Sequence, residues 1–146
     1  MLRPRIIPCL LVQNDGLVKT QRFGDPKYVG DPLNAARIFN EKEVDELTVL
    51  DIDATAQKRE PNYTMIRNLA GECRMPLCYG GGVSTADQIE KIVTLGVEKV
   101  AISAAAVRNP GLIAEGARRV GDQSIVVVLD VKKSGLMRRY EVFTHN

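Results

Sequence analysis

The sequence predicts an α/β fold of the (β/α)8 barrel class, of which its 146 residues supply the N-terminal half and the fifth strand. Short apolar runs alternate strictly with helical patterns, and polar residues stand at the carboxyl ends of successive runs. Those ends form the face where barrel proteins bind their ligands. An open doubly wound sheet has the same alternation, but no run ends in the spaced glycines of a dinucleotide site. The barrel is therefore favoured.

The strands and helices are predicted from hydrophobic period and composition. Five runs rich in Val, Ile and Leu have the character of buried parallel strands, at residues 6–12, 47–52, 75–79, 99–102 and 124–131. Helical patterns lie between them, at residues 32–42, 62–73, 85–95 and 110–120. Helix-start signals stand at Asp31-Pro32, Ser84-Thr85 and Asn109-Pro110. The order is β-α-β-α-β-α-β-α-β.

Composition narrows the functional classes. A formal net charge of +2, with scattered Lys and Arg, argues against a nucleic-acid partner, and no apolar run is long enough to span a membrane. Three cysteines and a single histidine, His145, do not form the pattern of a Cys/His metal site. We therefore expect no metal and no cofactor, reduced thiols, and a cytoplasmic location.

Length sets the expected domain organisation. A complete barrel has about 250 residues, so we expect residues 1–146 to be the N-terminal portion of one barrel domain in a longer chain. On its own, this portion would leave its first and fifth strands as unpaired edges, which invite association.

A glycine run marks a candidate ligand site. The chain passes from an apolar strand into Gly80, Gly81 and Gly82 and then into a helix start. Glycines leave backbone N–H groups uncovered, and a helix N-terminus favours negative charge. The pattern therefore indicates a phosphate site, with an ordinary strand-to-helix turn as the alternative.

Seven segments spread along the chain carry a resemblance to a known family. They are residues 5–10 (RIIPCL), 30–32 (GDP), 45–47 (DEL), 50–52 (LDI), 80–82 (GGG), 105–110 (AAVRNP) and 142–144 (VFT). In register, they resemble the cyclase subunit of imidazole glycerol phosphate synthase. The resemblance implies a (β/α)8 barrel that binds a glutaminase subunit as a heterodimer, takes ammonia through the barrel, and closes the imidazole ring of a histidine precursor. It also implies a phosphorylated, sugar-type substrate with one phosphate held by each half of the barrel.

The resemblance assigns roles to residues of the predicted ligand face. Gly82 matches the family's backbone phosphate contact, and Ser103-Ala104 stands where the family usually has Asn-Thr. The Ser103 hydroxyl can still donate a hydrogen bond. Lys19, in the long loop after the first strand, matches a lysine that reaches over the substrate. Asp130 matches one of two aspartates that act as general acid and base.

Three charged residues match a different part of the family's barrel. Arg5, Glu46 and Lys99 correspond to a ring of alternating charges at the end where ammonia enters from the glutaminase. Taken singly, each is read more simply as a solvated surface charge. Three matches at strand starts together favour the ammonia gate.

The second catalytic aspartate of the family is missing. Where the family reads Cys-Leu-Asp-Val, this chain has Leu11. Leucine cannot transfer protons, and Asp15 or Asp51 would sit too far from the required point. Two functions stay open. One is cyclisation in histidine biosynthesis. The other resembles the divergent cyclase-like proteins found beside sugar amidotransferases in surface-polysaccharide pathways, which convey ammonia without closing a ring.

Overall fold

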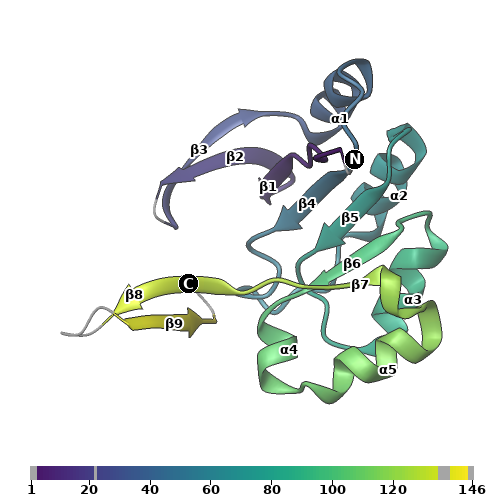
Figure 1. Ribbon diagram of the computed structural model, residues 1–146. Coiled ribbons are helices and arrows are strands. Elements are labelled where there is room, and N and C mark those ends of the chain that lie inside the picture. Colours follow the sequence, from purple (N-terminus) through teal and green to yellow (C-terminus); the bar gives the residue numbers. More distant parts are fainter. Residues whose placement is uncertain (1–2, 22, 135–138, 145–146) are drawn as a thin grey trace.

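The computed structural model describes residues 3–21, 23–134 and 139–144, and its helices lie along one side of a sheet (Figure 1). The five strands of the predicted parallel sheet are β1 (Cys9–Gln13), β4 (Leu47–Asp51), β5 (Leu77–Gly80), β6 (Lys99–Ile102) and β7 (Ile125–Val127). The four predicted helices are α1 (Pro32–Glu41), α2 (Tyr63–Glu72), α3 (Ala86–Thr94) and α5 (Gly111–Val120).

The sheet has the order and direction of consecutive barrel strands. β1, β4, β5, β6 and β7 lie side by side in chain order, and each pairs in parallel with the next. A helix connects each neighbouring pair, so the predicted class, a partial (β/α)8 barrel, is confirmed. Near the carboxyl ends, one row of Cα partners joins Leu11, Leu50, Gly80 and Ala101 across four strands.

The core lies between the sheet and the helices. Val49, Tyr79 and Val100 form an adjacent row of Cα partners and are fully buried, as are Ile66 of α2 and Ile89 of α3. Burial of a side chain of this size contributes about 1.5–3 kcal/mol. This core fills the space between the sheet and the helices. The pocket described below lies elsewhere, at the carboxyl ends of the strands.

The first predicted helix starts where it was expected, at Pro32, and the other three start one residue later than predicted, at Tyr63, Ala86 and Gly111. The Asp31 carboxylate accepts the N–H at the third position of α1 and so caps it. At α3, Thr85 and Gln88 form a reciprocal capping box. α5 begins at Gly111 rather than Pro110, because Pro110 takes the preceding cap position with helical backbone angles.

The segment predicted as a long loop after the first strand is instead a pair of strands. β2 (Gly16–Gln21) turns back along β1, and β3 (Gly24–Gly30) pairs with β2, both in antiparallel fashion. Asn14 and Asp15 take positive φ angles of 47° and 62°, as a tight hairpin turn requires. The first strand is therefore an interior strand, and the prediction that it forms an edge was wrong.

The fifth predicted strand, 124–131, is divided between two sheets. β7 ends at Val127, the Cα partner of the last residue of β6, so its parallel ladder stops there. Asp130 then begins β8 (Asp130–Ser134), which pairs antiparallel with β9 (Arg139–Phe143) in a separate two-stranded sheet. Asp130 thus lies beyond the end of β7 and not within the fifth strand. Two short helices that the pattern did not reveal, α4 (Ala104–Arg108) and η1 (Asp122–Ser124), flank α5.

Candidate functional site

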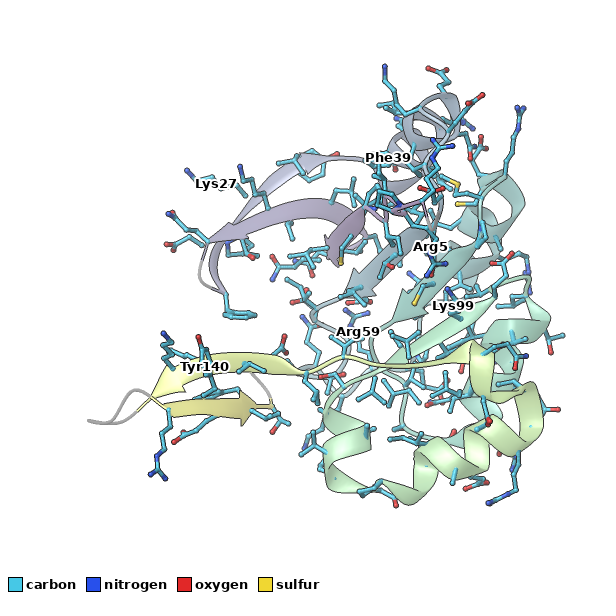
Figure 2. The ribbon with its side chains drawn as sticks, viewed as in Figure 1. Arg5, Lys27, Phe39, Arg59, Lys99 and Tyr140 are labelled. Atoms are coloured by element: carbon cyan, nitrogen blue, oxygen red, sulfur yellow. The ribbon has the colours of Figure 1, made fainter. Side chains whose placement is uncertain are left out.

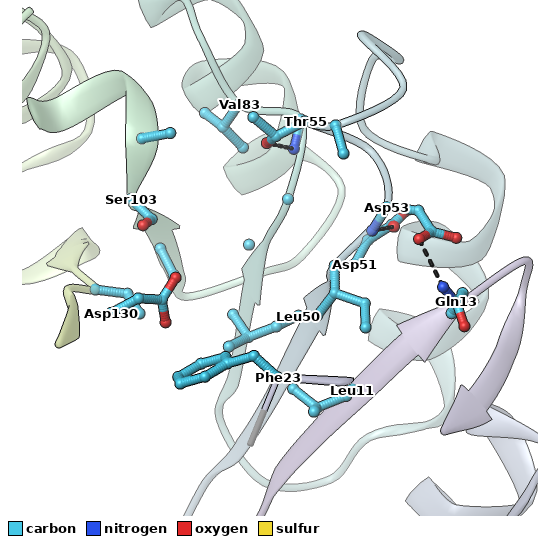
Figure 3. Close-up of a pocket in the computed structure, with 18 of the residues that line it drawn as sticks. Leu11, Gln13, Phe23, Leu50, Asp51, Asp53, Thr55, Val83, Ser103 and Asp130 are labelled. Carbon is cyan, nitrogen blue, oxygen red and sulfur yellow. Dashed lines mark hydrogen bonds between the residues drawn. The ribbon is translucent and has the colours of Figure 1, made fainter. Parts of the chain in front are cut away.

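A pocket of about 350 Å³ opens at the carboxyl ends of β1, β4, β5 and β6 (Figure 3). The three glycines at residues 80–82, here called the glycine turn, form part of its wall. Ser103, Ala104 and Asp130 line the same pocket. The structure therefore brings together four of the residues that the sequence nominated, Gly82, Ser103, Ala104 and Asp130.

The conformation of the glycine turn depends on its own backbone angles and on the loop that packs against it. Gly81 and Gly82 have φ angles of 118° and 72°, a region that favours glycine. A Cβ atom on Gly82 would lie 2.7 Å from the backbone oxygen of Arg59, so the loop after β4 packs directly on the turn. The Gly82 N–H donates to the Thr55 hydroxyl at 3.3 Å.

Ser103 stands where β6 passes into α4. Its side chain is half-buried, and its hydroxyl makes no capping hydrogen bond to that helix. The next residue, Ala104, is buried and offers only its backbone N–H. The Ser103 hydroxyl is thus positioned to donate into the pocket that it lines.

Lys19 is not brought into the pocket. It lies on β2 opposite Lys27, and its side chain is exposed. The neighbouring residue Thr20 lines the pocket instead. Phe23, which follows the end of β2, also lines it, although the sequence pattern gave no sign of this because residues 16–30 were not expected to form strands.

Position 11 contributes an apolar surface to the pocket. Leu11 lies on β1, between Val18 of β2 and Leu50 of β4 in the register. Leu11 and Leu50 both line the pocket, so this part of the wall has no group that transfers protons.

Asp51 was considered above as a replacement for the aspartate missing at position 11. Its carboxylate is already bonded to the loop that follows β4. Its Oδ1 atom accepts the backbone N–H groups of Asp53 and Ala54 at 3.1 and 3.0 Å, and the Arg59 guanidinium lies 3.6 Å away. Burial raises the pKa of the Asp51 carboxyl, and these donors and the Arg59 charge oppose that rise. The carboxylate therefore organises the loop. Asp53 is also buried, and its Oδ1 accepts the Gln13 side-chain amide at 2.9 Å.

The three residues of the predicted ammonia gate meet at the amino ends of the strands. Lys99 Nζ lies 2.6 Å from Glu46 Oε2, and Arg5 Nη1 lies 3.7 Å from the same oxygen. Figure 2 shows Arg5 and Lys99 near each other on this side of the sheet. Glu46 is only 4% exposed. The part-buried Lys99 ammonium therefore supplies the opposite charge nearest to the buried Glu46 carboxylate.

Some classes of site are not found in the described part of the chain. Within residues 3–21, 23–134 and 139–144, no cluster of three or more His, Cys, Asp or Glu side chains is arranged to hold a metal ion. The single histidine, His145, lies outside those residues. Among the helices of the same segments, none is long and apolar enough to cross a membrane. All three cysteines are unpaired thiols.

The parallel strands and their helices on one side define a partial (β/α)8 barrel, and the pocket lies at the carboxyl ends of its strands, the face where such barrels hold their ligands. Residues 5–146 match the family described as histidine biosynthesis protein, and the chain belongs to that family. This agrees with the resemblance to the cyclase subunit of imidazole glycerol phosphate synthase that the sequence motifs carried.

Individual relatives agree with the family. The chain is 60% identical over its whole length to a protein of Leptospira borgpetersenii with the provisional name imidazole glycerol phosphate synthase subunit HisF. It is 58% identical to a protein of the same provisional name from Leptospira interrogans, and 56% identical to one named subunit hisF2 from Pseudomonas aeruginosa. In each case all of this chain aligns with 58% of the relative. The chain thus spans a little over half the length of these relatives.

Proposed function

We propose that residues 1–146 are the N-terminal portion of a single barrel domain in a cyclase-type subunit of imidazole glycerol phosphate synthase. Membership of the histidine biosynthesis protein family and identities of 56–60% to proteins provisionally named HisF support this proposal. The complete subunit would close the imidazole ring of a histidine precursor in the cytoplasm, using ammonia released from glutamine by a glutaminase partner.

One observation carries the proposal at the level of the site, namely that Gly82, Ser103 and Asp130 line one pocket. In the proposed mechanism, the Gly82 N–H, the Ser103 hydroxyl and the Ala104 backbone hold one phosphate of the substrate. Asp130 transfers a proton as general acid or base. Lys19 requires a movement of the β2–β3 pair to reach over the substrate, because its side chain lies outside the pocket.

The proposed ammonia entrance lies at the opposite ends of the strands. Arg5, Glu46 and Lys99 form a cluster of alternating charge there, with Glu46 buried between the two cations. A glutaminase subunit docked at this end would deliver ammonia to the barrel without release into water. The arrangement supports a heterodimer with the gate at the subunit contact.

A second function is favoured by Leu11. Ring closure by two carboxylates needs a proton-transferring group on β1, and this position carries an apolar side chain in the pocket wall. Loss of that group together with retention of the gate residues fits a relay, in which the barrel conveys ammonia to a sugar amidotransferase of surface-polysaccharide biosynthesis. Both functions use the same gate and differ in the chemistry of the pocket.

The test compares the complete protein with its Leu11→Asp variant. Each is supplied with the histidine precursor and with ammonium salt or an active glutaminase partner, and ring closure is followed by product formation. A new general acid or base contributes about 10² to 10⁴-fold, so the relay reading expects very slow turnover by the unmodified protein and a large rise in the variant. The exposed residue Ile38 on α1 offers the control Ile38→Asp, which adds a carboxylate away from the pocket and should change nothing.

Unmodified protein that already cyclises rapidly, with no gain from Leu11→Asp, would establish the cyclase and reject the relay. Slow turnover that Leu11→Asp does not improve would show that the pocket lacks more than one carboxylate, which rejects cyclisation by this protein.

A further inference from the structure

The loop between β4 and α2 (residues 52–62, the β4–α2 loop) places a hydroxyl group against the glycine turn. Thr55, which lies in this loop, is half-buried and lines the pocket. Its Oγ1 atom accepts the N–H of Gly82, the donor proposed for the substrate phosphate, and Figure 3 marks this bond. Thr55 therefore occupies a position that an oxygen of a bound anion would take.

The β4–α2 loop holds Thr55 in place through its own hydrogen bonds. The Asp51 carboxylate accepts two N–H groups at the start of the loop, and the Arg59 N–H donates to the Ala54 oxygen at 2.7 Å. The Lys58 N–H donates to the backbone oxygen of Thr55 itself, at 3.2 Å. The loop also rests on Gly82, where a Cβ atom would meet the Arg59 oxygen. These contacts hold the backbone of Thr55 beside the glycine turn and, among the described residues, leave its hydroxyl bonded only to Gly82.

The chemistry of the contact suits replacement by an anion. At 3.3 Å, the bond from Gly82 to Thr55 is longer than the usual 2.9–3.0 Å of an N–H···O bond. A phosphate oxygen accepts an N–H more strongly because the bond is charge-assisted. A threonine hydroxyl is both acceptor and donor, so Thr55 can release the Gly82 N–H and donate its own proton to the same phosphate.

We infer that Thr55 is a further phosphate-binding residue, which accepts from Gly82 when the site holds no anion and donates to the phosphate when one binds. This inference rests on the proposed phosphate site at Gly82 and Ser103. It adds a donor from the loop after β4 to those that follow β5 and β6, so that the segments after three consecutive strands contribute to one anion site.

The experiment measures the affinity of the complete protein for inorganic phosphate by calorimetry. Thr55→Val keeps the shape of the side chain and removes the hydroxyl, and it should weaken binding by about ten-fold to a hundred-fold, the range expected on losing one hydrogen bond to a charged group. Thr55→Ser keeps the hydroxyl and should bind within about two-fold of the unmodified protein. The control is Thr64→Val, because Thr64 is exposed on α2 and does not line the pocket.

A second measurement on the unmodified protein covers the case in which Thr55→Val does not fold. On titration with phosphate, the backbone amide signals of Thr55 and Gly82 should shift together and give one dissociation constant by NMR. A Gly82 signal that shifts while Thr55 is unmoved would overturn the role of Thr55, as would unchanged or tighter binding by folded Thr55→Val. Unmodified protein that binds no phosphate would overturn the proposed site itself and Thr55 with it.

Discussion

The fold requires glycine at position 82 for reasons that do not depend on a ligand. Its φ of 72° and its contact with the β4–α2 loop both exclude a side chain, whether or not the pocket is filled. The sequence predicted a turn with uncovered N–H groups, but it could not show that a loop from an earlier strand would pack on that turn. Proline at this position is a poor probe of phosphate binding, because its φ near −65° is incompatible with the turn.

We expect Gly82→Ala to lower the free energy of unfolding by about 3 kcal/mol, from the unfavourable φ angle and the clash with the Arg59 oxygen. The measurement is urea denaturation of the complete protein. The control is Gly71→Ala on α2, where a Cβ atom meets nothing within 4 Å and alanine should stabilise by about 0.5–1 kcal/mol. Equal stability of Gly82→Ala and the unmodified protein would mean that the loop does not rest on the turn.

At the scale of elements, the parallel strands and their helices were predicted and the antiparallel pairs were not. The predicted strands at 47–52, 75–79 and 99–102 are found as β4, β5 and β6, with bounds that differ by at most two residues, because short apolar runs between helical patterns are typical of parallel strands. β2 and β3 were missed because they carry many polar residues, and their pairing depends on the turn at Asn14 and Asp15. The run 124–131 is apolar apart from Ser124 and Asp130, and such a run does not reveal where a strand leaves one sheet for another.

The same limits apply to the candidate site. Gly82, Ser103 and Asp130 were nominated by the family resemblance, residue by residue, and their arrangement in one pocket follows from the parallel order of the strands. Thr55 was not nominated. Nothing in the sequence of the β4–α2 loop indicates that one of its hydroxyl groups accepts a hydrogen bond from Gly82, which follows a later strand. The assignments of function to these residues remain predictions.

The capping box of α3 offers a test of one element. Thr85 Oγ1 accepts the Gln88 N–H at 3.3 Å, while Gln88 Oε1 accepts the Thr85 N–H at 3.2 Å. Thr85→Ala should therefore lower the free energy of unfolding by about 1 kcal/mol. Denaturant titration measures this effect, with Thr64→Ala in the first turn of α2 as the control, because Thr64 is exposed and does not occupy the cap position. A loss no greater than that of the control would show that the box contributes nothing in solution.

At the scale of the whole molecule, the segment from β7 to β9 exposes several large apolar side chains. Val127 on β7, Leu129, and Val131 and Val142 on the β8–β9 pair are between 44% and 50% exposed. Within the described residues, β3 and β7 are the outer strands of the main sheet. β7 is apolar and carries no charged residue, whereas β3 contains Asp25 and Lys27. Charged side chains protect an edge strand from pairing with another chain. Of the two outer strands, β7 therefore has the greater tendency to pair with a second chain.

This asymmetry predicts how residues 1–146 behave when they are produced alone. They should associate through β7 and the adjacent apolar side chains, since an unprotected edge and an apolar surface both promote pairing between chains. Sedimentation velocity over a range of concentrations should show dimers or larger species, and Val127→Lys should shift the distribution towards monomer. Ile38→Lys, at an exposed apolar site on α1, should leave the distribution unchanged. The complete protein should show no such dependence on Val127, because the rest of the proposed barrel covers β7. A concentration-independent monomer for residues 1–146 would show that β7 is protected within this part of the chain and would remove one support for the longer barrel.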